Sequence, residues 1–346
     1  MLLLADGFDQ YGDTPTMSLA YTVLGDCFQC VNRNPRTGSG SLTWRQGATN
    51  ADYCQRFLPS NASQIYMGFA INFQTLLDTF NSNNYFTFDI LDDLGNIQIQ
   101  MQITALGELN FFRGSNNQII KTSFRLTPKK YSYLEIGLKI DPVSGVLEVR
   151  VDGDKQAIFV GNTQNGTGLI NSIRFTGVRV FGTPDFDIDD LYLCDPIGIT
   201  FNNFLGPVHM RTLLPTADTT NSDWTITGAV SGNAAVGLIP PNIGARYIQA
   251  TAVGNETDFT YPNIPATAYA IYGVLIGAFV QQSVASGIST MSLGLNSNGV
   301  TSDSIPLTPP NVGRFLYQLF SFDPEQGAQW ITKKVNLVRT RLIRTT

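Results

Sequence analysis

Apolar and polar residues alternate along much of the first half of the chain. The clearest run is Ile97–Ile103, which places four apolar side chains on one face of a strand and three glutamines on the other. The same criteria predict further strands over residues 65–73, 85–91, 131–140, 146–151, 156–160, 172–181 and 186–194. Strands at a spacing of roughly ten residues, with little helical periodicity between them, indicate an antiparallel sandwich.

Turn signals separate these runs. Leu94-Gly95-Asn96 predicts a hairpin turn after the strand over 85–91, and Asp152-Gly153 predicts one after the strand over 146–151. Glycine supplies the positive φ that a tight hairpin turn requires.

The sequence changes character near Asp195-Pro196-Ile197-Gly198, where we place a domain boundary. Residues 1–197 carry 14 basic and 20 acidic residues (net −6), whereas residues 198–346 carry 8 and 7 (net +1). Residues 259–302 hold no charged side chain, so we expect them to be buried in their own core or against another subunit. Runs typical of strands occur there and nearby, at 269–280, 288–295 and 315–322. We therefore expect an all-β chain whose second, smaller β domain covers residues 198–346.

Composition narrows the classes of partner. The formal charge is −5 and the isoelectric point about 4.9, so the surface as a whole lacks the positive charge that nucleic-acid binding requires. The longest charge-poor apolar run, residues 266–280, is shorter than the roughly 20 residues that a membrane-spanning helix needs. No glycine-rich phosphate loop is present. We expect no nucleic-acid partner, no membrane segment and no cofactor.

The cysteines and the single histidine do not lie in motifs typical of a catalytic or metal site. Cys27 and Cys30 have C-x-x-C spacing, but a second such pair and a βαβ pattern are both missing. We interpret them, with Cys54 and Cys194, as buried or incidental thiols; one disulfide or a metal site are the alternatives. His209 alternates with apolar neighbours and has no nucleophile motif to serve, so we expect a structural or partner-contact role.

Several segments of the first half resemble the laminin G-like, concanavalin A-like jelly roll. Residues 131–140 and then 144–153 (SGVLEVRVDG) resemble the family's apolar strand and its hairpin ending in Asp-Gly or Asn-Gly. Residues 186–195 (FDIDDLYLCD) resemble its closing strand, and residues 4–11 (LADGFDQY) resemble the start of such modules in tailed bacteriophages. The resemblance implies a jelly-roll sandwich over residues 1–197.

The second half contains segments similar to those of tailed-phage structural proteins, in the same order. They are residues 203–211 (NFLGPVHMR), 214–218 with Trp224, 322–330 and Val335-Asn336. Gln326 stands where those proteins usually have Thr. The resemblance implies a virion structural protein, assembled in the host cytoplasm, that acts as a capsid decoration, fibre or tail-associated component. Its partners would be other virion proteins and further copies of itself.

The densest acidic cluster consists of Asp187, Asp189, Asp190 and Asp195. On a regular strand Asp187 and Asp189 share one face and Asp190 points to the other. The cluster either caps loops and turns or binds a divalent ion such as Ca²⁺, which some laminin G-like modules hold near a sheet edge. Because Ca²⁺ needs several converging oxygens, alternating carboxylates favour the first interpretation.

The C-terminal segment is basic and has no acidic residue after Glu325. A strand over residues 335–343 either docks on an acidic neighbour, such as the −6 half of another copy, or is a solvated edge strand protected by Lys and Arg. The candidate assembly contacts are His209, Trp330, Lys333, Lys334, Arg339, Arg341 and Arg344.

Carbohydrate chemistry gives two further hypotheses. A glycoside hydrolase needs two opposed carboxylates, and none of the five glutamates lies in the dense Glu/Asp strand motif of the family's hydrolases, so we predict that the protein is not an enzyme. The alternative to an assembly role is an adhesin that binds a host-surface glycan by stacking aromatic rings on sugars. Its candidate residues, for which a core role is the competing interpretation, are Trp44, Tyr53, Tyr66, Phe111 and Phe112.

Overall fold

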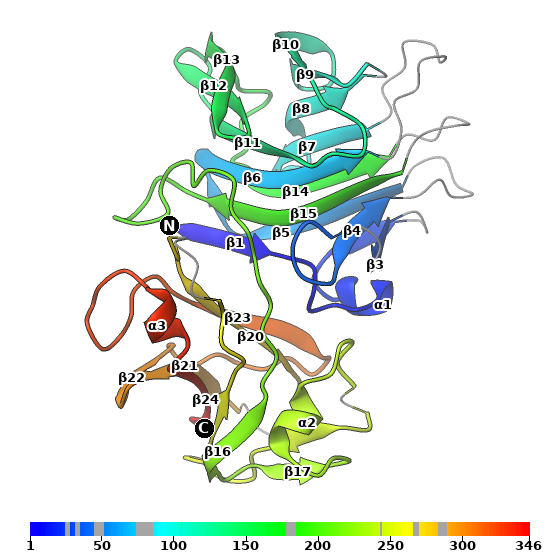
Figure 1. The fold of residues 1–346 in the computed structure, drawn as a ribbon. Helices are drawn as coiled ribbons and strands as arrows, with labels where there is room; N and C mark the ends of the chain where they lie inside the picture. Colours follow the sequence, from blue (N-terminus) through cyan, green and yellow to red (C-terminus); the bar gives the residue numbers. More distant parts are fainter. Residues whose placement is uncertain are drawn as a thin grey trace. The chain divides into compact units, whose positions relative to one another are not determined.

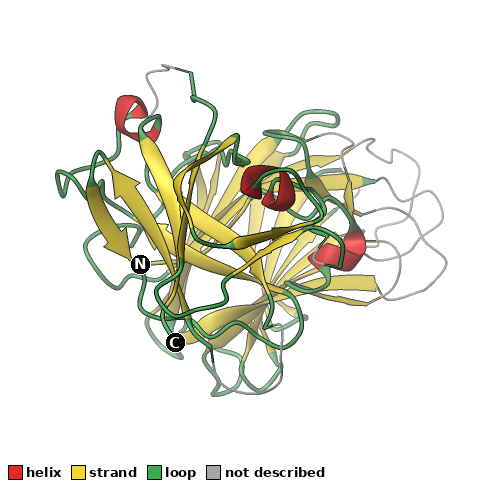
Figure 2. Ribbon diagram, turned by 90° about the horizontal axis from the view of Figure 1, so that it is seen from below, coloured by secondary structure: helices red, strands yellow, loops and turns green. Residues whose placement is uncertain are grey.

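The computed structural model describes residues 1–24, 28–31, 35–44, 52–73, 86–104, 106–177, 185–242, 244–265, 270–282 and 289–346. Within these ranges the chain is all-β, as the alternation predicted, with short helices α1 (Thr14–Met17), α2 (Gly232–Val236) and α3 (Thr332–Val335) (Figure 2). It divides into two compact units, Met1–Thr212 and Leu213–Thr346 (Figure 1). No helix in the described ranges is long and apolar enough to cross a membrane.

The first unit is a jelly-roll sandwich of two antiparallel sheets. Sheet A runs in the order β13-β12-β11-β6-β15-β4-β3, with β1 paired to β15, and sheet B runs in the order β10-β9-β8-β7-β14-β5-β2. The strands of sheet A are β1 (Leu2–Asp6), β3 (Phe28–Val31), β4 (Ser41–Trp44), β6 (Gln64–Phe73), β11 (Ser132–Lys139), β12 (Gly145–Val151), β13 (Asp154–Gly161) and β15 (Phe186–Cys194). The strands of sheet B are β2 (Thr22–Leu24), β5 (Asp52–Ala62), β7 (Phe86–Asp92), β8 (Ile97–Ile103), β9 (Glu108–Arg113), β10 (Asn117–Arg125) and β14 (Ile170–Gly177).

Aromatic residues from both sheets fill the space between them. The ring of Phe69 in sheet A lies 5.3 Å from that of Phe88 and 5.4 Å from that of Phe175, both in sheet B. Trp44 is buried and stacks on Phe186 with ring centroids 4.9 Å apart. Burying such a side chain contributes roughly 1.5–3 kcal/mol. Since side chains alternate along each strand, the residues between these core positions point to the outer face of their sheet.

Two predicted hairpins are present. Gly95 has φ +82° in the turn between β7 and β8, and Asp152 and Gly153 have φ 52° and 89° between β12 and β13. Two successive positive φ values are the signature of a type I′ turn, which matches the twist of the strands that it joins.

The boundary between the units follows Thr212, whereas the sequence placed it after residue 197. The intervening chain packs on the jelly roll: the Phe204 ring lies 5.1 Å from that of Tyr66, and the Arg150 guanidinium lies 4.0 Å from the Phe204 ring centroid. At Gly137 a Cβ atom would come within 2.6 Å of the Phe204 ring, so any larger residue here would displace that ring. The segment has no hydrophobic period, and the sequence pattern therefore gave no sign of this packing.

The second unit contains one five-stranded antiparallel sheet and two strand pairs. The sheet runs in the order β16-β19-β24-β21-β22, and the pairs are β17-β18 and β20-β23. The strands are β16 (Ala217–Ser222), β17 (Thr225–Thr227), β18 (Tyr247–Gln249), β19 (Glu256–Thr260), β20 (Val274–Val280), β21 (Met291–Ser297), β22 (Val300–Asp303), β23 (Arg314–Phe320) and β24 (Val338–Arg344).

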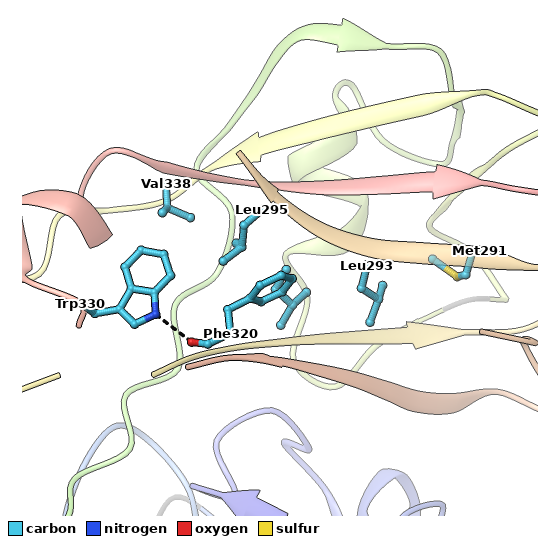
Figure 3. Close-up of a cluster of buried hydrophobic side chains, with 7 residues drawn as sticks. Met291, Leu293, Leu295, Phe320, Trp330 and Val338 are labelled. Atoms are coloured by element: carbon cyan, nitrogen blue, oxygen red, sulfur yellow. Dashed lines mark hydrogen bonds between the residues drawn. The ribbon is translucent and has the colours of Figure 1, made fainter. Parts of the chain in front are cut away.

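The core of the second unit lies between the five-stranded sheet and the β20-β23 pair. Figure 3 shows its buried side chains, which are Ile276, Met291, Leu293, Leu295, Phe320, Trp330 and Val338. Trp330 Nε1 donates to the carbonyl oxygen of Phe320 at 2.7 Å, which satisfies the indole N–H inside this core. Within the charge-free stretch, β20 is buried along one face, since Ile276 is in the core while Leu275 is 38% exposed, and β21 is buried on both faces.

Candidate functional site

The outer face of sheet A is covered by the chain itself. Residues 203–210, which we call the covering segment, present backbone N–H groups to side chains of the sheet. Leu205 N donates to Tyr192 Oη at 3.1 Å, and Gly206 N donates to Glu135 Oε1 at 2.8 Å. Tyr192 Oη also donates to Glu135 Oε1 at 2.6 Å, and both side chains are buried. The polar groups here therefore bind the protein's own backbone.

The acidic cluster holds loops at the same sheet. Thr43 Oγ1 donates to Asp187 Oδ1 at 2.8 Å, and the Arg36 backbone N–H donates to Asp189 Oδ2 at 2.8 Å. The Arg36 guanidinium lies 2.7 Å from Asp190 Oδ2, and both groups are largely buried. Among the described residues, no group of three or more His, Cys, Asp or Glu side chains is placed to hold a metal ion. Loop capping accounts for these carboxylates, and a divalent ion is not needed to explain them.

A β-bulge changes the direction of two of these aspartates. Asp190 has φ 52° and the register of β15 against β6 shifts between Asp189 and Tyr192. The expected alternation fails at this point, because Asp189 and Asp190 both contact the Arg36 loop. Burial, followed by the charge of Asp190, raises the pKa of Asp189 to about 8.

His209 belongs to the first unit and lies within the covering segment. Its Nδ1 atom lies 2.8 Å from Thr37 Oγ1 and 3.7 Å from Asp190 Oδ2, and its side chain is 58% exposed. Burial and the nearby Arg36 charge lower the pKa of His209. Its role as an assembly contact stays a prediction.

The basic residues of the C-terminal segment mostly have partners within their own unit. Arg341 donates to Glu256 Oε1 at 2.6 Å and to Asp303 Oδ2 at 2.8 Å. Lys334 forms an ion pair with Glu325. Trp330 is buried in the core of the second unit, so in this fold its side chain is not accessible to another subunit.

The strand that carries these charges is not an edge strand, which corrects one of the two interpretations. β24 pairs with β19 on one side and with β21 on the other, so its backbone groups are already satisfied. Arg344 donates to the Thr346 carbonyl oxygen at 3.0 Å. Lys333 and Arg339 are exposed, and for them an assembly role stays a prediction.

The outer face of sheet B carries two rows of polar and aromatic side chains that cross strands β9, β8, β7, β14 and β5. In that order, the first row is Asn110, Gln102, Thr87, Thr176 and Tyr53. The second row is Phe112, Gln100, Asp89, Arg174 and Gln55. We call these two rows the polar face. Its half-buried members are Tyr53, Gln55, Asn110, Phe112, Arg174 and Thr176, and the side chains of Thr87, Asp89, Gln100 and Gln102 are mostly buried.

A chain of hydrogen bonds runs across the centre of the polar face. Gln102 Nε2 donates to Gln100 Oε1 at 2.7 Å, and Gln100 Nε2 donates to Asp89 Oδ1 at 2.8 Å. Arg174 donates to Asp89 Oδ2 from Nε at 3.0 Å and from Nη2 at 2.7 Å. The Arg174 guanidinium lies 5.6 Å from the ring centroid of Tyr53. These contacts fix the side chains before any ligand arrives, which lowers the entropy cost of binding.

Two oxygen atoms of the first row have no hydrogen-bond partner. They are Asn110 Oδ1 and Thr176 Oγ1, and both are buried. Leaving a buried polar atom unpaired costs roughly 1–3 kcal/mol, and such atoms are uncommon in native proteins. With strands about 4.8 Å apart, the two residues lie roughly 14 Å from each other across the sheet.

The structure sorts the five aromatic candidates. Tyr53 and Phe112 lie on the polar face and are half-buried. Trp44 and Phe111 are buried in the core, as the competing interpretation expected, and Tyr66 lies beneath the covering segment. Two of the candidates therefore remain available to a sugar.

Three of the four cysteines are free and buried: Cys30, Cys54 and Cys194. Burial raises the pKa of Cys30 and of Cys194 to about 12, which makes these thiols unreactive at neutral pH. The interpretation as buried thiols is confirmed for these three, and Cys27 lies outside the described residues.

No family model and no curated protein matches this sequence. Solved structures that are similar include an endo-β-1,4-glucuronan lyase from the fungus Trichoderma reesei, 12% identical, with a TM-score of 0.37 over 50% of this chain and 86% of that chain. An alginate lyase is 13% identical, with a TM-score of 0.39 over 60% and 98%. Lectin II from Ulex europaeus is 10% identical, with a TM-score of 0.39 over 56% and 98%. At these identities the likeness bears on the fold alone.

The prediction that the protein is not an enzyme is contradicted by the two lyases in this comparison. That prediction rested on the absence of a glutamate motif found in hydrolases of this fold. The motif concerns one class of enzyme only, so its absence says nothing of the others.

Proposed function

We propose that the jelly-roll unit binds a carbohydrate on the polar face of sheet B. The observation that carries this proposal is the ordered chain from Gln102 through Gln100 and Asp89 to Arg174, with an aromatic ring at each side. Sugars present hydroxyl groups around an apolar ring face, and such ligands are held by a few fixed polar groups together with aromatic surfaces. The polar face supplies both kinds of group within neighbouring strands.

The outer face of sheet A is a poorer candidate. Its polar side chains already bind backbone groups of the covering segment, as the Gly206 contact with Glu135 shows. A ligand there would first have to displace that segment and break its hydrogen bonds. Glu135 Oε2 on sheet A also lacks a partner, but its side chain is already bound by Gly206. On sheet B Asn110 Oδ1 and Thr176 Oγ1 lack partners and are not bound by that segment.

A glycan array probed with the full-length protein tests the proposal. We expect binding to at least one glycan class, and we expect Tyr53→Ala and Gln100→Ala to weaken it by removing a stacking ring and an amide of the chain. The matched control is Tyr272→Ala, since Tyr272 is a 44% exposed tyrosine of the second unit and should leave binding unchanged. An array without signal, or equal loss in all three variants, would reject a site on this face.

We also propose that this binding takes place on a tailed-phage virion. The support is the ordered set of segments in both halves that resemble phage structural proteins, including residues 4–11 and 203–211. The expected assembly is a homo-oligomer. Light scattering on the purified full-length chain tests this: a stable oligomer supports the proposal, and a monomer at high concentration speaks against it.

A further inference from the structure

We infer that the polar face takes a neutral, hydroxyl-rich glycan and not a polyuronate. This inference rests on the proposed function and adds the chemical class of the ligand. Two independent features of the face lead to it: the balance of its charges and the kind of hydrogen-bond partner that its unpaired atoms need.

The charges of the polar face cancel. Arg174 is its one cation, and two of its N–H groups bind Asp89, whose side chain is only 2% exposed. At the neighbouring β9-β10 edge two cations share one carboxylate: Glu108 accepts from Arg125 at 2.8 Å and lies 3.4 Å from Lys121 Nζ, so one positive charge is in excess at this edge and not within the two rows. A polyuronate carries a carboxylate on every sugar, and a face that binds one needs a surplus of positive charge. The polar face offers no such surplus.

The unpaired atoms need hydrogen-bond donors. The amide oxygen of Asn110 is an acceptor only, and the hydroxyl oxygen of Thr176 accepts through its lone pairs. A sugar hydroxyl donates to either oxygen, whereas an ionised carboxylate only accepts. Hydroxyl groups spaced along a glycan that crosses the strands therefore satisfy both oxygens of the first row, and a carboxylate placed against Asn110 leaves its oxygen unpaired. Because uronate sugars carry hydroxyl groups too, this feature favours a hydroxyl-rich ligand and the charge balance is what disfavours the polyuronate.

The glutamines fit the same ligand class. Each amide has both donors and an acceptor, so Gln55 and Gln102 match hydroxyl groups in either orientation. Gln55 Nε2 already donates to Ser172 Oγ at 2.9 Å, which holds it in place at the end of the second row. A site made mainly of amides and hydroxyls is typical of neutral polar ligands.

A matched pair of polymers tests the inference with the full-length protein. Alginate and carboxyl-reduced alginate share linkages and differ in charge, and a panel of neutral hexose polymers is added because the linkage is unknown. We expect binding to at least one neutral polymer and none to alginate or glucuronan. Equal or tighter binding to the uronates, or release of unsaturated products from them, would overturn the inference and leave the proposed function standing. Binding to no polymer at all would reject both.

Three variants sharpen the test. Asn110→Leu and Thr176→Val each remove one acceptor and should weaken binding of the neutral polymer about 2- to 10-fold, the range of a single hydrogen bond. Because each also removes an unpaired buried atom, neither should lower the melting temperature, which separates lost contact from lost folding. Thr301→Val, at an exposed threonine of β22, is the control and should bind like the parent.

Asp89→Asn tests the charge balance directly. It leaves Arg174 without its counter-charge, so alginate binding, which is absent in the parent, should become detectable at low salt and disappear as salt is added. An unchanged preference in this variant would show that the Asp89–Arg174 pair does not set the ligand class.

Discussion

The two outer faces of the jelly roll are built from similar residues, but their polar side chains have different hydrogen-bond partners. Both carry a buried aspartate paired with an arginine, Asp190 with Arg36 on sheet A and Asp89 with Arg174 on sheet B. On sheet A backbone N–H groups of the covering segment bind these polar side chains, as Met210 N donates to Asp190 Oδ1 at 2.7 Å, and one oxygen of the bound Glu135 stays unpaired. On sheet B the partners are side chains of the same face, and the neighbouring oxygens of Asn110 and Thr176 stay unpaired.

The difference helps to distinguish polar side chains that stabilise the fold from polar side chains that can bind a ligand. A polar face whose groups are satisfied by the chain's own backbone stabilises the fold. A face whose side chains are aligned by one another but keep unpaired atoms retains part of its hydrogen-bonding capacity for another molecule. Variants in each face should therefore affect different properties: stability on sheet A and binding on sheet B.

The largest effect on stability is expected from Asp190→Ala. It leaves the largely buried Arg36 guanidinium without its partner and removes the acceptor of Met210 N. Breaking a buried pair in this way costs about 3–5 kcal/mol, to be measured by calorimetry or denaturant unfolding of the full chain. Lys121→Ala is the control on the sheet B side, since its side chain is 62% exposed and no change in the unfolding transition is expected.

Tyr192→Phe should have the next largest effect. The hydroxyl lost here donates to Glu135 and accepts from Leu205 N, so two buried groups lose a partner at once. We expect a loss of about 1–3 kcal/mol, with faster proteolysis inside residues 203–210. Tyr66→Phe is the matched control under the same segment, and if both variants were cut equally fast, the hydroxyl would not be what holds the segment.

The covered face should also make stability depend on pH. The pKa of Asp189 is raised to about 8 by burial and then by the charge of Asp190, so the native state binds a proton more tightly than the unfolded chain. Stability then falls as pH rises from the ordinary aspartate range toward 8, and Asp189→Asn should flatten that fall. Unfolding free energies at pH 5, 6, 7 and 8 check this, and parallel curves for parent and variant would contradict it.

The smallest loss of stability is expected on the polar face. Gln102→Ala removes one donor to Gln100 Oε1 and should cost about 0.5–1.5 kcal/mol, because the exposed rim of the face lets water replace it. The same variant should weaken glycan binding measurably. If it unfolded the protein as readily as Asp190→Ala does, the contrast between the two faces would be false.

Much of the fold was predictable because strands leave a period of two in the sequence. The run at Ile97–Ile103 placed its glutamines on one face before any pairing was known, and Gln100 and Gln102 lie on the polar face. The Asp152-Gly153 turn followed from the φ values that such a turn requires.

The parts that failed depend on pairing between distant strands. Arg174 and Asp89 are 85 residues apart, and nothing local shows that β14 lies beside β7. The pairing of the basic strand was likewise not visible in the sequence. Arg341, a candidate contact to another subunit, forms its ion pair with Glu256 of the neighbouring strand β19, 85 residues away in the same unit. The covering segment binds sheet A partly through backbone N–H groups, as at Leu205, Gly206 and Met210, and such bonds leave no side-chain pattern in the sequence.

The covering segment also has a mechanical consequence. The chain passes from it into the second unit at Leu213, so a load transmitted along the backbone from that unit enters the jelly roll at this segment. The bonds of Met210 N to Asp190 and Gly206 N to Glu135 lie on this path ahead of strand β15. Tension along the chain therefore has to detach the segment from sheet A before it reaches strand β15.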